Sequence, residues 1–222
     1  MNERIIKAVI FDQDGLMFDT ERVSAEAWGK AGMEFHMRLD ESFLKTIRGT
    51  NYEDAKKRFL AAFGDQVDFD RFRARKNEYY EAMLREQGVP VKPGLKELLS
   101  YLKEQGYPAA VGSASQLSYT ERNLEETGIR TYFDCLVTGD MVSHAKPNPE
   151  IFLKAANLLG EEPRHCLVLE DSLNGVEAGL AGGFVTVMVP DLTQPDENLK
   201  KRVHRVCDSL LDVLEFFKKG EL

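Results

Sequence analysis

The stretch Ala8-Val-Ile-Phe-Asp12-Gln-Asp14-Gly15 decides the fold, because it joins an apolar run to a pair of acids. Residues 5–11 are apolar apart from one lysine, which predicts a buried strand. Asp12 and Asp14 follow at positions i and i+2, which share a face while the chain is extended. Ligands of an open parallel sheet bind beyond the carboxyl ends of its strands, so both acids are expected to face one pocket. A divalent cation would relieve their repulsion, although an Asp-Gly turn is the simpler alternative.

The composition of the 222 residues is that of a globular protein, with 43% hydrophobic and 30% charged residues. The net charge of −8 argues against nucleic-acid or membrane partners, which need basic surfaces, but leaves room for a small anionic substrate. The sequence shows neither an apolar run of 18 residues nor a signal peptide, and its three cysteines are far apart. Reduced thiols and a cytoplasmic location are therefore expected.

Two kinds of segment follow the first strand. Residues 20–88 contain four segments with helical patterning and short links, which predict a small helical bundle. Beyond the Pro- and Gly-rich residues 89–94, helices alternate with short apolar strands, the pattern of a doubly wound parallel sheet. The first strand must belong to that sheet, since alone it could not be buried. We therefore predict an α/β core domain of residues 1–16 and 89–222, with a helical domain of residues 17–88 inserted into it.

Four of the predicted strands end in polar residues with complementary chemistry. Asp12 and Asp14 follow the first strand, and Ser113 follows the second in a loop whose hydroxyl and amide groups could hold an anion. The loop after the third strand contains Lys146, and the fourth strand ends in Glu170-Asp171. Carboxylates for a cation, with a hydroxyl and a lysine for an anion, suit phosphoryl transfer assisted by Mg²⁺, which prefers oxygen ligands.

The chain resembles the haloacid dehalogenase superfamily of phosphotransferases, most closely the branch of β-phosphoglucomutase and related small-molecule phosphatases. The resemblance rests on four segments in order, FDQDGLMFDTE (11–21), VGSAS (111–115), HAKPNPEIF (144–152) and LEDSLNGVEAG (169–179). It implies a Rossmann-like core with a helical cap domain, Mg²⁺ as cofactor and a small phosphorylated metabolite as substrate. A monomer is the expected state of an enzyme that carries its own cap.

The resemblance also implies a role for each matching residue. Asp12 is expected to be the nucleophile that forms an aspartyl-phosphate, and Asp14 the general acid and then the general base. Glu170 and Asp171 are expected to bind Mg²⁺ together with Asp12 and the backbone carbonyl of Asp14. The residues implied to bind the transferring phosphoryl group are Ser113, Ala114 through its N–H group, and Lys146.

Residues of the helical domain distinguish between two possible activities, that of a phosphatase and that of a sugar phosphomutase. Ser24 stands where β-phosphoglucomutase has a hinge histidine, and Tyr52 stands where it has a phosphate-binding arginine. Lys76 fits the mutase pattern. Two mismatches against one match favour a phosphatase, with a β-phosphoglucomutase-like mutase as the alternative. Within this domain, Arg48, Tyr52 and Lys76 are the residues expected to contact the substrate.

Other functions explain the motifs less well. A dehalogenase would use the nucleophile but would need neither Mg²⁺ nor the second acid, Asp14. A non-enzymatic phospho-receiver also combines acids, a hydroxyl and a lysine at strand ends, but would have no reason to insert a helical domain. A binding module descended from the fold would be expected to have lost a signature residue, and all of them are present.

Overall fold

The computed structural model describes residues 6–47, 52–65 and 67–221. The chain divides into two compact units, each of which is considered by itself. The core unit comprises Met1–Phe18 and Val91–Leu222, and the helical unit comprises Asp19–Pro90. The domain limits expected from the sequence, 16/17 and 88/89, lie two residues before these divisions.

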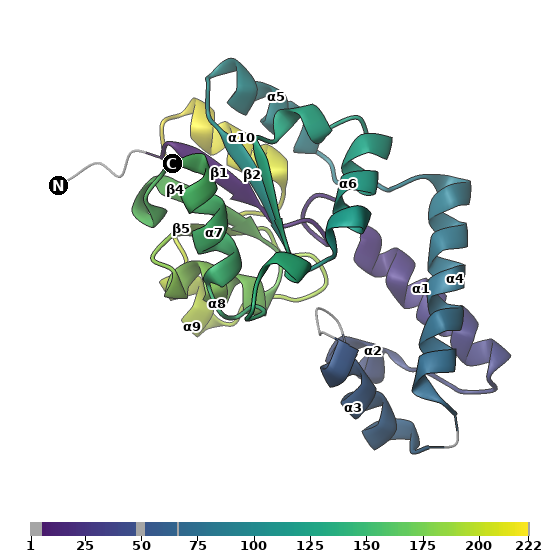
Figure 1. The fold of residues 1–222 in the computed structure, drawn as a ribbon. Helices are drawn as coiled ribbons and strands as arrows, with labels where there is room; N and C mark the ends of the chain where they lie inside the picture. Colours follow the sequence, from purple (N-terminus) through teal and green to yellow (C-terminus); the bar gives the residue numbers. More distant parts are fainter. Residues whose placement is uncertain (1–5, 48–51, 66, 222) are drawn as a thin grey trace. The chain divides into compact units, whose positions relative to one another are not determined.

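The core unit is built on a parallel sheet (Figure 1). Within the described residues the sheet has six strands in the order β3-β2-β1-β4-β5-β6. Their bounds are β1 (Ala8–Phe11), β2 (Ala109–Ser113), β3 (Cys135–Thr138), β4 (Cys166–Glu170), β5 (Val185–Met188) and β6 (Arg205–Val206). In the centre, Ile10 of β1 pairs with Ala110 on one side and Val168 on the other, and all three are fully buried. The predicted doubly wound parallel sheet is confirmed.

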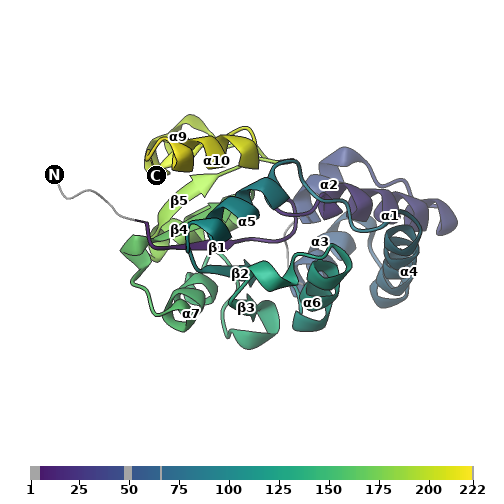
Figure 2. The ribbon, with the colours of Figure 1, turned by 90° about the horizontal axis from the view of Figure 1, so that it is seen from above.

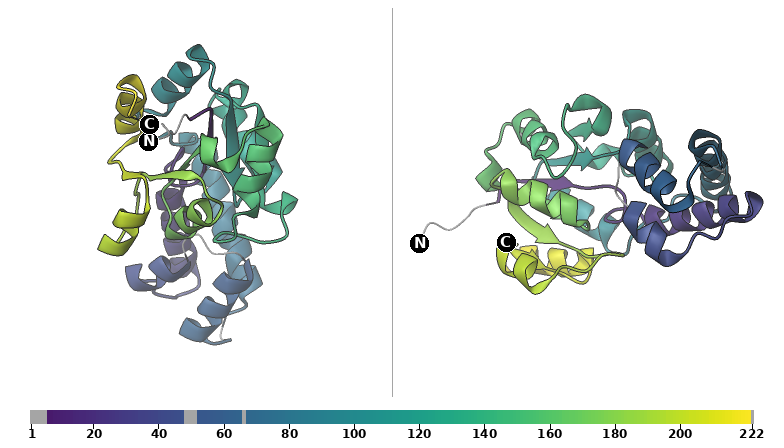
Figure 3. Two further views of the ribbon diagram at one scale, coloured as in Figure 1. Left: turned by 90° about the vertical axis from the view of Figure 1, so that its left-hand side faces the viewer. Right: turned by 90° about the horizontal axis from the view of Figure 1, so that it is seen from below.

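Helices cover both faces of the sheet. Figures 2 and 3 show α10 (Leu210–Lys218) on one side and α7 (Glu150–Leu159) on the other. The apolar face of α7 packs with β1 and β2, and its Phe152 belongs to the same buried cluster as Ala178 of α8. The remaining helices of this unit are α5 (Leu95–Glu104), which packs against α10, together with α6 (Leu117–Glu126), α8 (Leu173–Ala181) and α9 (Glu197–Arg202).

The connections change direction between β1 and β4. From β1 the chain proceeds outward to β2 and β3, whereas from β4 it proceeds outward to β5 and β6 on the other side. Such a switch point leaves a crevice beyond the carboxyl ends of the two central strands, which is where open α/β sheets bind their ligands. The first and fourth signature segments leave the sheet at this point.

The helical unit contains α1 (Thr20–Glu34), α2 (Glu41–Ile47), α3 (Tyr52–Phe63) and α4 (Phe69–Gln87), with α1 and α4 side by side (Figure 1). Its centre is aromatic. Trp28 stacks on Phe72 with ring centroids 5.5 Å apart, and Phe59 lies 5.0 Å from Phe72. Buried aromatic side chains give this small unit a hydrophobic core of its own. Among the described helices of the chain, none has the length and hydrophobicity that a membrane crossing requires.

Candidate active site

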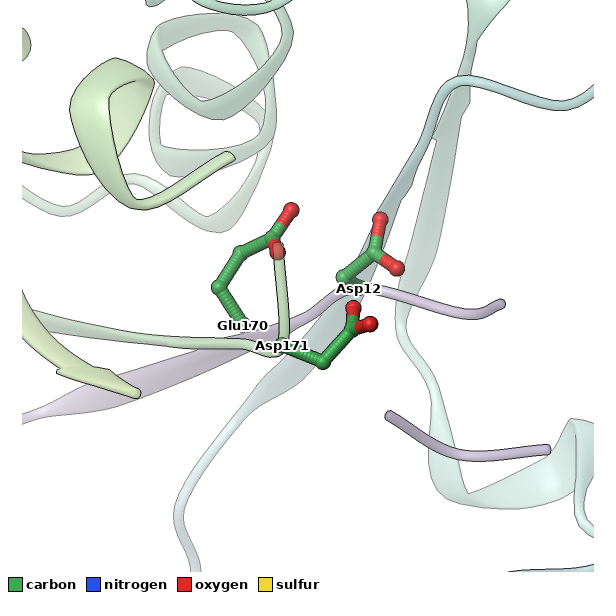
Figure 4. A group of neighbouring side chains, drawn as sticks. All are labelled: Asp12, Glu170 and Asp171. Atoms are coloured by element: carbon green, nitrogen blue, oxygen red, sulfur yellow. The ribbon is translucent and has the colours of Figure 1, made fainter. Parts of the chain in front are cut away.

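Three carboxylates meet at the switch point. Asp12 follows β1, Glu170 is the last residue of β4, and Asp171 comes next. Carboxylate oxygens of these three residues lie within 4.8 Å of one another, and Figure 4 shows them gathered beside the ends of both strands. All three residues are less than one-tenth exposed. The sequence predicts these acids at the ends of the first and fourth strands, and the structure brings them together.

The register of the sheet explains this meeting. Phe11 of β1 pairs with Leu169 of β4, so the next residue of each strand leaves the sheet at the same level. The Asp12 N–H donates to the Leu169 carbonyl oxygen at 3.0 Å, which fixes the backbone where the nucleophile is expected. The apolar strands are buried on both faces, and the first polar residues after them are therefore held on a rigid support.

Lys146 joins the carboxylates from the loop before α7. Its Nζ lies 2.5 Å from Asp12 Oδ1 and 2.7 Å from Glu170 Oε1, and the side chain is only 7% exposed. Burial opposes the charged ammonium, but the two carboxylates outweigh it and raise the pKa of Lys146. The lysine therefore stays cationic.

One ammonium does not neutralise the acids around it. Burial raises the pKa of Asp12 from 3.8 to about 8, and the charges of Glu170 and Asp14 add to this effect while Lys146 opposes it. An additional cation would favour ionised Asp12. Buried carboxylates offer only oxygen donors, which suit a hard divalent cation. The residues present therefore fit a metal site of the kind predicted.

Glu170 is fixed on both of its oxygens. Oε1 accepts from Lys146, and Oε2 accepts from the N–H and the hydroxyl of Ser172 at 2.8 and 2.9 Å. The Ser172 hydroxyl in turn accepts from the Gly175 N–H at 3.1 Å and caps α8. The turn between β4 and α8 thus orients Glu170. Its bond to Lys146 helps to hold that ammonium beside Asp12, whereas metal binding by Glu170 stays a prediction.

Gly175 is required by this arrangement, and its replacement with Ala provides a test. A Cβ atom at this position would lie 1.6 Å from Glu170 Oε1, so the carboxylate would have to move. We expect Gly175→Ala to lower kcat/KM for a phosphomonoester by about tenfold or more, because misplaced catalytic groups lose rate steeply. Gly29→Ala is the matched control, since a Cβ in that helix meets nothing within 4 Å. Equal activities of the two variants would show that the position of Glu170 is unimportant.

The loop after β2 supplies the groups expected to hold phosphate. Ser113 is the last residue of β2 and is 1% exposed, whereas Ala114 after it is exposed. Because Phe11 pairs with Val111, Ser113 reaches the edge of the sheet from which Asp12 emerges. The Ser113 hydroxyl accepts from the Ser115 N–H at 3.1 Å, which shapes the loop. Phosphate binding by Ser113, Ala114 and Lys146 stays a prediction.

Asp14 is held by two hydroxyl groups to which the sequence analysis assigned no role. Tyr119 donates to Oδ1 at 3.0 Å, and Ser115 donates to Oδ2 at 2.7 Å. No local pattern marks Tyr119, which stands in the first turn of the helix that follows the loop of Ser115. After Asp14, Gly15 has a φ of +92°, and a Cβ there would lie 2.2 Å from Asp171 Oδ2. Only glycine allows this close approach.

The three residues expected to contact substrate from the helical unit have different outcomes. Arg48 lies outside the described residues. The Tyr52 hydroxyl bonds to Asp70, and Lys76 Nζ lies 4.7 Å from the centroid of the Tyr80 ring, so both of these contacts fall within the unit. Substrate contact by Tyr52 and Lys76 stays a prediction.

A doubly wound sheet with acids and a lysine at its switch point defines an α/β enzyme whose chemistry takes place at strand ends. The family model for haloacid dehalogenase-like hydrolases matches residues 6–183. The chain belongs to this family and is a hydrolase of that kind, which confirms the resemblance drawn from its motifs.

Relatives of known name include phosphatases and a mutase. The chain is 29% identical over 179 residues to the phosphorylated carbohydrates phosphatase of Thermotoga maritima, covering 81% of this chain and 82% of the relative. It is 30% identical over 181 residues to the fructose-1-phosphate phosphatase YqaB of Escherichia coli, covering 82% and 95%. The crystal structure of β-phosphoglucomutase from Clostridium difficile is similar with a TM-score of 0.79 and 26% identity, covering 97% of this chain and 96% of that one.

Proposed function

We propose that this protein is a Mg²⁺-dependent phosphatase that hydrolyses a small phosphorylated sugar or polyol through an aspartyl-phosphate. The observation that carries the proposal is the buried group of Asp12, Glu170 and Asp171 with Lys146 bonded to the first two. The substrate class is supported by two relatives, whose names specify phosphorylated carbohydrates and fructose 1-phosphate.

Mg²⁺ would be held by Asp12, Glu170 and Asp171 together with the backbone carbonyl of Asp14. When bound, it supplies positive charge that favours ionised Asp12 and offsets the charge of the phosphoryl oxygens. Lys146 supplies a second positive charge, fixed within hydrogen-bond distance of the nucleophile. Ser113 and the Ala114 N–H would orient the phosphoryl oxygens, so that phosphorus faces Asp12.

In the first step, a carboxylate oxygen of Asp12 attacks phosphorus and the bond from phosphorus to the ester oxygen breaks. Asp14 gives a proton to the departing oxygen, and the sugar leaves as a neutral alcohol. In the second step, water attacks the phosphorus of the aspartyl-phosphate while Asp14 takes a proton from it. The bond to the Asp12 oxygen then breaks, which releases phosphate and restores the carboxylate.

A sugar phosphomutase is the second candidate, favoured by the likeness to a β-phosphoglucomutase structure. Such an enzyme must transfer the phosphoryl group from its aspartate to a hydroxyl of a sugar monophosphate, which forms the bisphosphate, before water reaches the aspartyl-phosphate. Ser24 and Tyr52 replace the two residues that we associate with this behaviour in mutases. They support hydrolysis as the main reaction.

The test is a comparison of two activities. Phosphate release would be measured from fructose 1-phosphate, glucose 6-phosphate, glycerol phosphate and nucleoside monophosphates with Mg²⁺ present. Isomerisation of β-glucose 1-phosphate, primed with the 1,6-bisphosphate, would be followed in parallel. Release from sugar or polyol phosphates without isomerisation supports the proposal. Rapid isomerisation with little release makes the enzyme a mutase, and inactivity in both assays returns the binding module and the phospho-receiver to consideration.

Removal of divalent cations is expected to lower phosphate release by about 100-fold or more, since a bound cation offsets several kcal/mol of developing charge. Enzyme treated with a chelator and then dialysed would be assayed with and without added Mg²⁺. Mg²⁺ should restore the rate, and Asp171→Asn should raise the Mg²⁺ concentration needed for half-maximal activity. Full activity of the dialysed enzyme would contradict a metal-dependent mechanism.

A further inference from the structure

The carboxyl group of Asp14 lies between two hydroxyls from a single short segment. Tyr119 OH donates to one oxygen at 3.0 Å and Ser115 Oγ donates to the other at 2.7 Å. All three residues belong to the core unit and are half-buried. We call this arrangement, in which Tyr119 and Ser115 hold Asp14, the clamp. It lies entirely within the core unit.

The local fold sets both halves of this clamp. On one side, the turn after Asp14 is closed by a bond from the Gly15 N–H to the Phe18 carbonyl at 2.8 Å. On the other side, α6 begins at Leu117, and Tyr119 in its first turn faces the acid. Leu124 of the same helix is fully buried and anchors α6 on the core, so the phenol is presented from a packed element.

Holding both oxygens has a chemical consequence. A carboxyl group with one bonded oxygen can still rotate about its terminal torsion, which is a broad one. Donors on both oxygens fix the plane of the group as well as its position. A hydroxyl both donates and accepts, so the contacts can persist whether or not Asp14 carries the proton.

We propose that Tyr119, together with Ser115, is a positioning residue for proton transfer, holding Asp14 in the orientation that serves the leaving oxygen and later the attacking water. This inference rests on the proposed phosphatase function and deepens it. Tyr119 acts through Asp14 and does not itself touch the substrate. A purely structural tether of α6 to the Asp14 turn is the competing explanation, and the two differ in which substrates suffer from the loss of the hydroxyl.

Tyr119→Phe removes the hydroxyl and keeps the ring. An alkyl phosphate needs a proton on its departing oxygen, whereas p-nitrophenyl phosphate releases a stable phenolate without one. The variant should therefore lower kcat/KM for the sugar phosphate by about 10- to 100-fold, a fraction of the roughly 100- to 10,000-fold contribution of a general acid. The value for p-nitrophenyl phosphate should change by less than about threefold. The value of kcat/KM reports the step in which the alcohol leaves.

The second step gives an independent readout. If Asp14 also activates water, then the variant should hydrolyse its aspartyl-phosphate slowly and show a pre-steady-state burst of p-nitrophenol. Ser115→Ala should shift both readouts in the same direction. Tyr132→Phe is the matched control, since its hydroxyl pairs with Ser100 at 3.3 Å in the same unit, and both of its rates should match those of the wild type.

Three outcomes would overturn the inference. Equal losses of kcat/KM on both substrates would mean that the hydroxyl is a structural tether, and unchanged values on both would mean that the clamp does not contribute to catalysis. A faster reaction with the sugar phosphate would mean that the clamp holds Asp14 in an orientation from which it cannot transfer the proton. Failure of the proposed function is distinguishable, because the wild-type enzyme would then release phosphate from neither substrate.

Discussion

Replacing Asp12 with Asn is expected to lower phosphate release by about 1,000-fold or more, the loss seen when a covalent nucleophile is removed. The amide cannot form the acyl phosphate, although it keeps the shape of the carboxylate and can still accept from Lys146. The measurement is the steady-state rate of phosphate release at saturating substrate with Mg²⁺. Activity within tenfold of the wild type would exclude Asp12 as the nucleophile.

The same variant should not lose stability, and this separates lost chemistry from lost folding. The pKa of Asp12 is about 8 in the folded chain, against an ordinary value of 3.8. Between these values the folded state retains a proton that the unfolded state releases, so ionisation weighs progressively against folding as the pH rises towards 8. Asn avoids this cost. Without divalent cations at pH 8, Asp12→Asn should need at least as much urea for half-unfolding as the wild type, and a lower midpoint would contradict the charge balance described.

Most helices and strands of the core unit can be predicted from hydrophobic patterns in the sequence, because burial dictates where apolar residues fall. Strands buried on both faces appear as short apolar runs, and the apolar run at residues 135–138 is where β3 lies. By contrast, α9 and β6 are not predicted by any pattern in the sequence. The first has six residues, mostly polar, and the second has two half-buried residues at the sheet edge. Neither is long enough to show a period.

In the candidate site, too, some features can be predicted from the sequence and others only from the structure. Asp12 and Glu170 were recognisable because each follows an apolar run, and strand ends in a parallel sheet converge. The clamp on Asp14 cannot be recognised from the sequence, because a hydrogen bond between side chains 105 residues apart depends on where α6 packs. Likewise, Gly175 is informative only once Glu170 Oε1 is known to lie 1.6 Å from its missing Cβ. Local pattern predicts which groups reach the site, and packing decides what holds them there.

Lys146→Met is expected to damage both activity and stability, unlike Asp12→Asn. Met keeps much of the length of the side chain and removes the ammonium, which leaves Asp12 and Glu170 buried without their shared cation. Removing one partner of a buried ion pair costs about 3–5 kcal/mol of folding free energy. Phosphate release should also fall by about 100-fold or more, as when a preorganised electrostatic group is removed. Urea unfolding without divalent cations and phosphate release with Mg²⁺ measure the two effects.

The comparison of variants identifies the cause. Lys154→Met removes an exposed ammonium whose hydrogen bond, within the part of the chain that the structure describes, goes to the backbone oxygen of Met141 in the same unit. It should leave both quantities near their wild-type values. If the stability lost in Lys146→Met arises from repelling carboxylates, then adding Asp12→Asn to it should recover part of that loss, because one of the two charges is gone. The cycle must therefore be non-additive. Simple addition of the two single effects would mean that Lys146 stabilises the fold by packing, and that its charge does not balance the acids at the switch point.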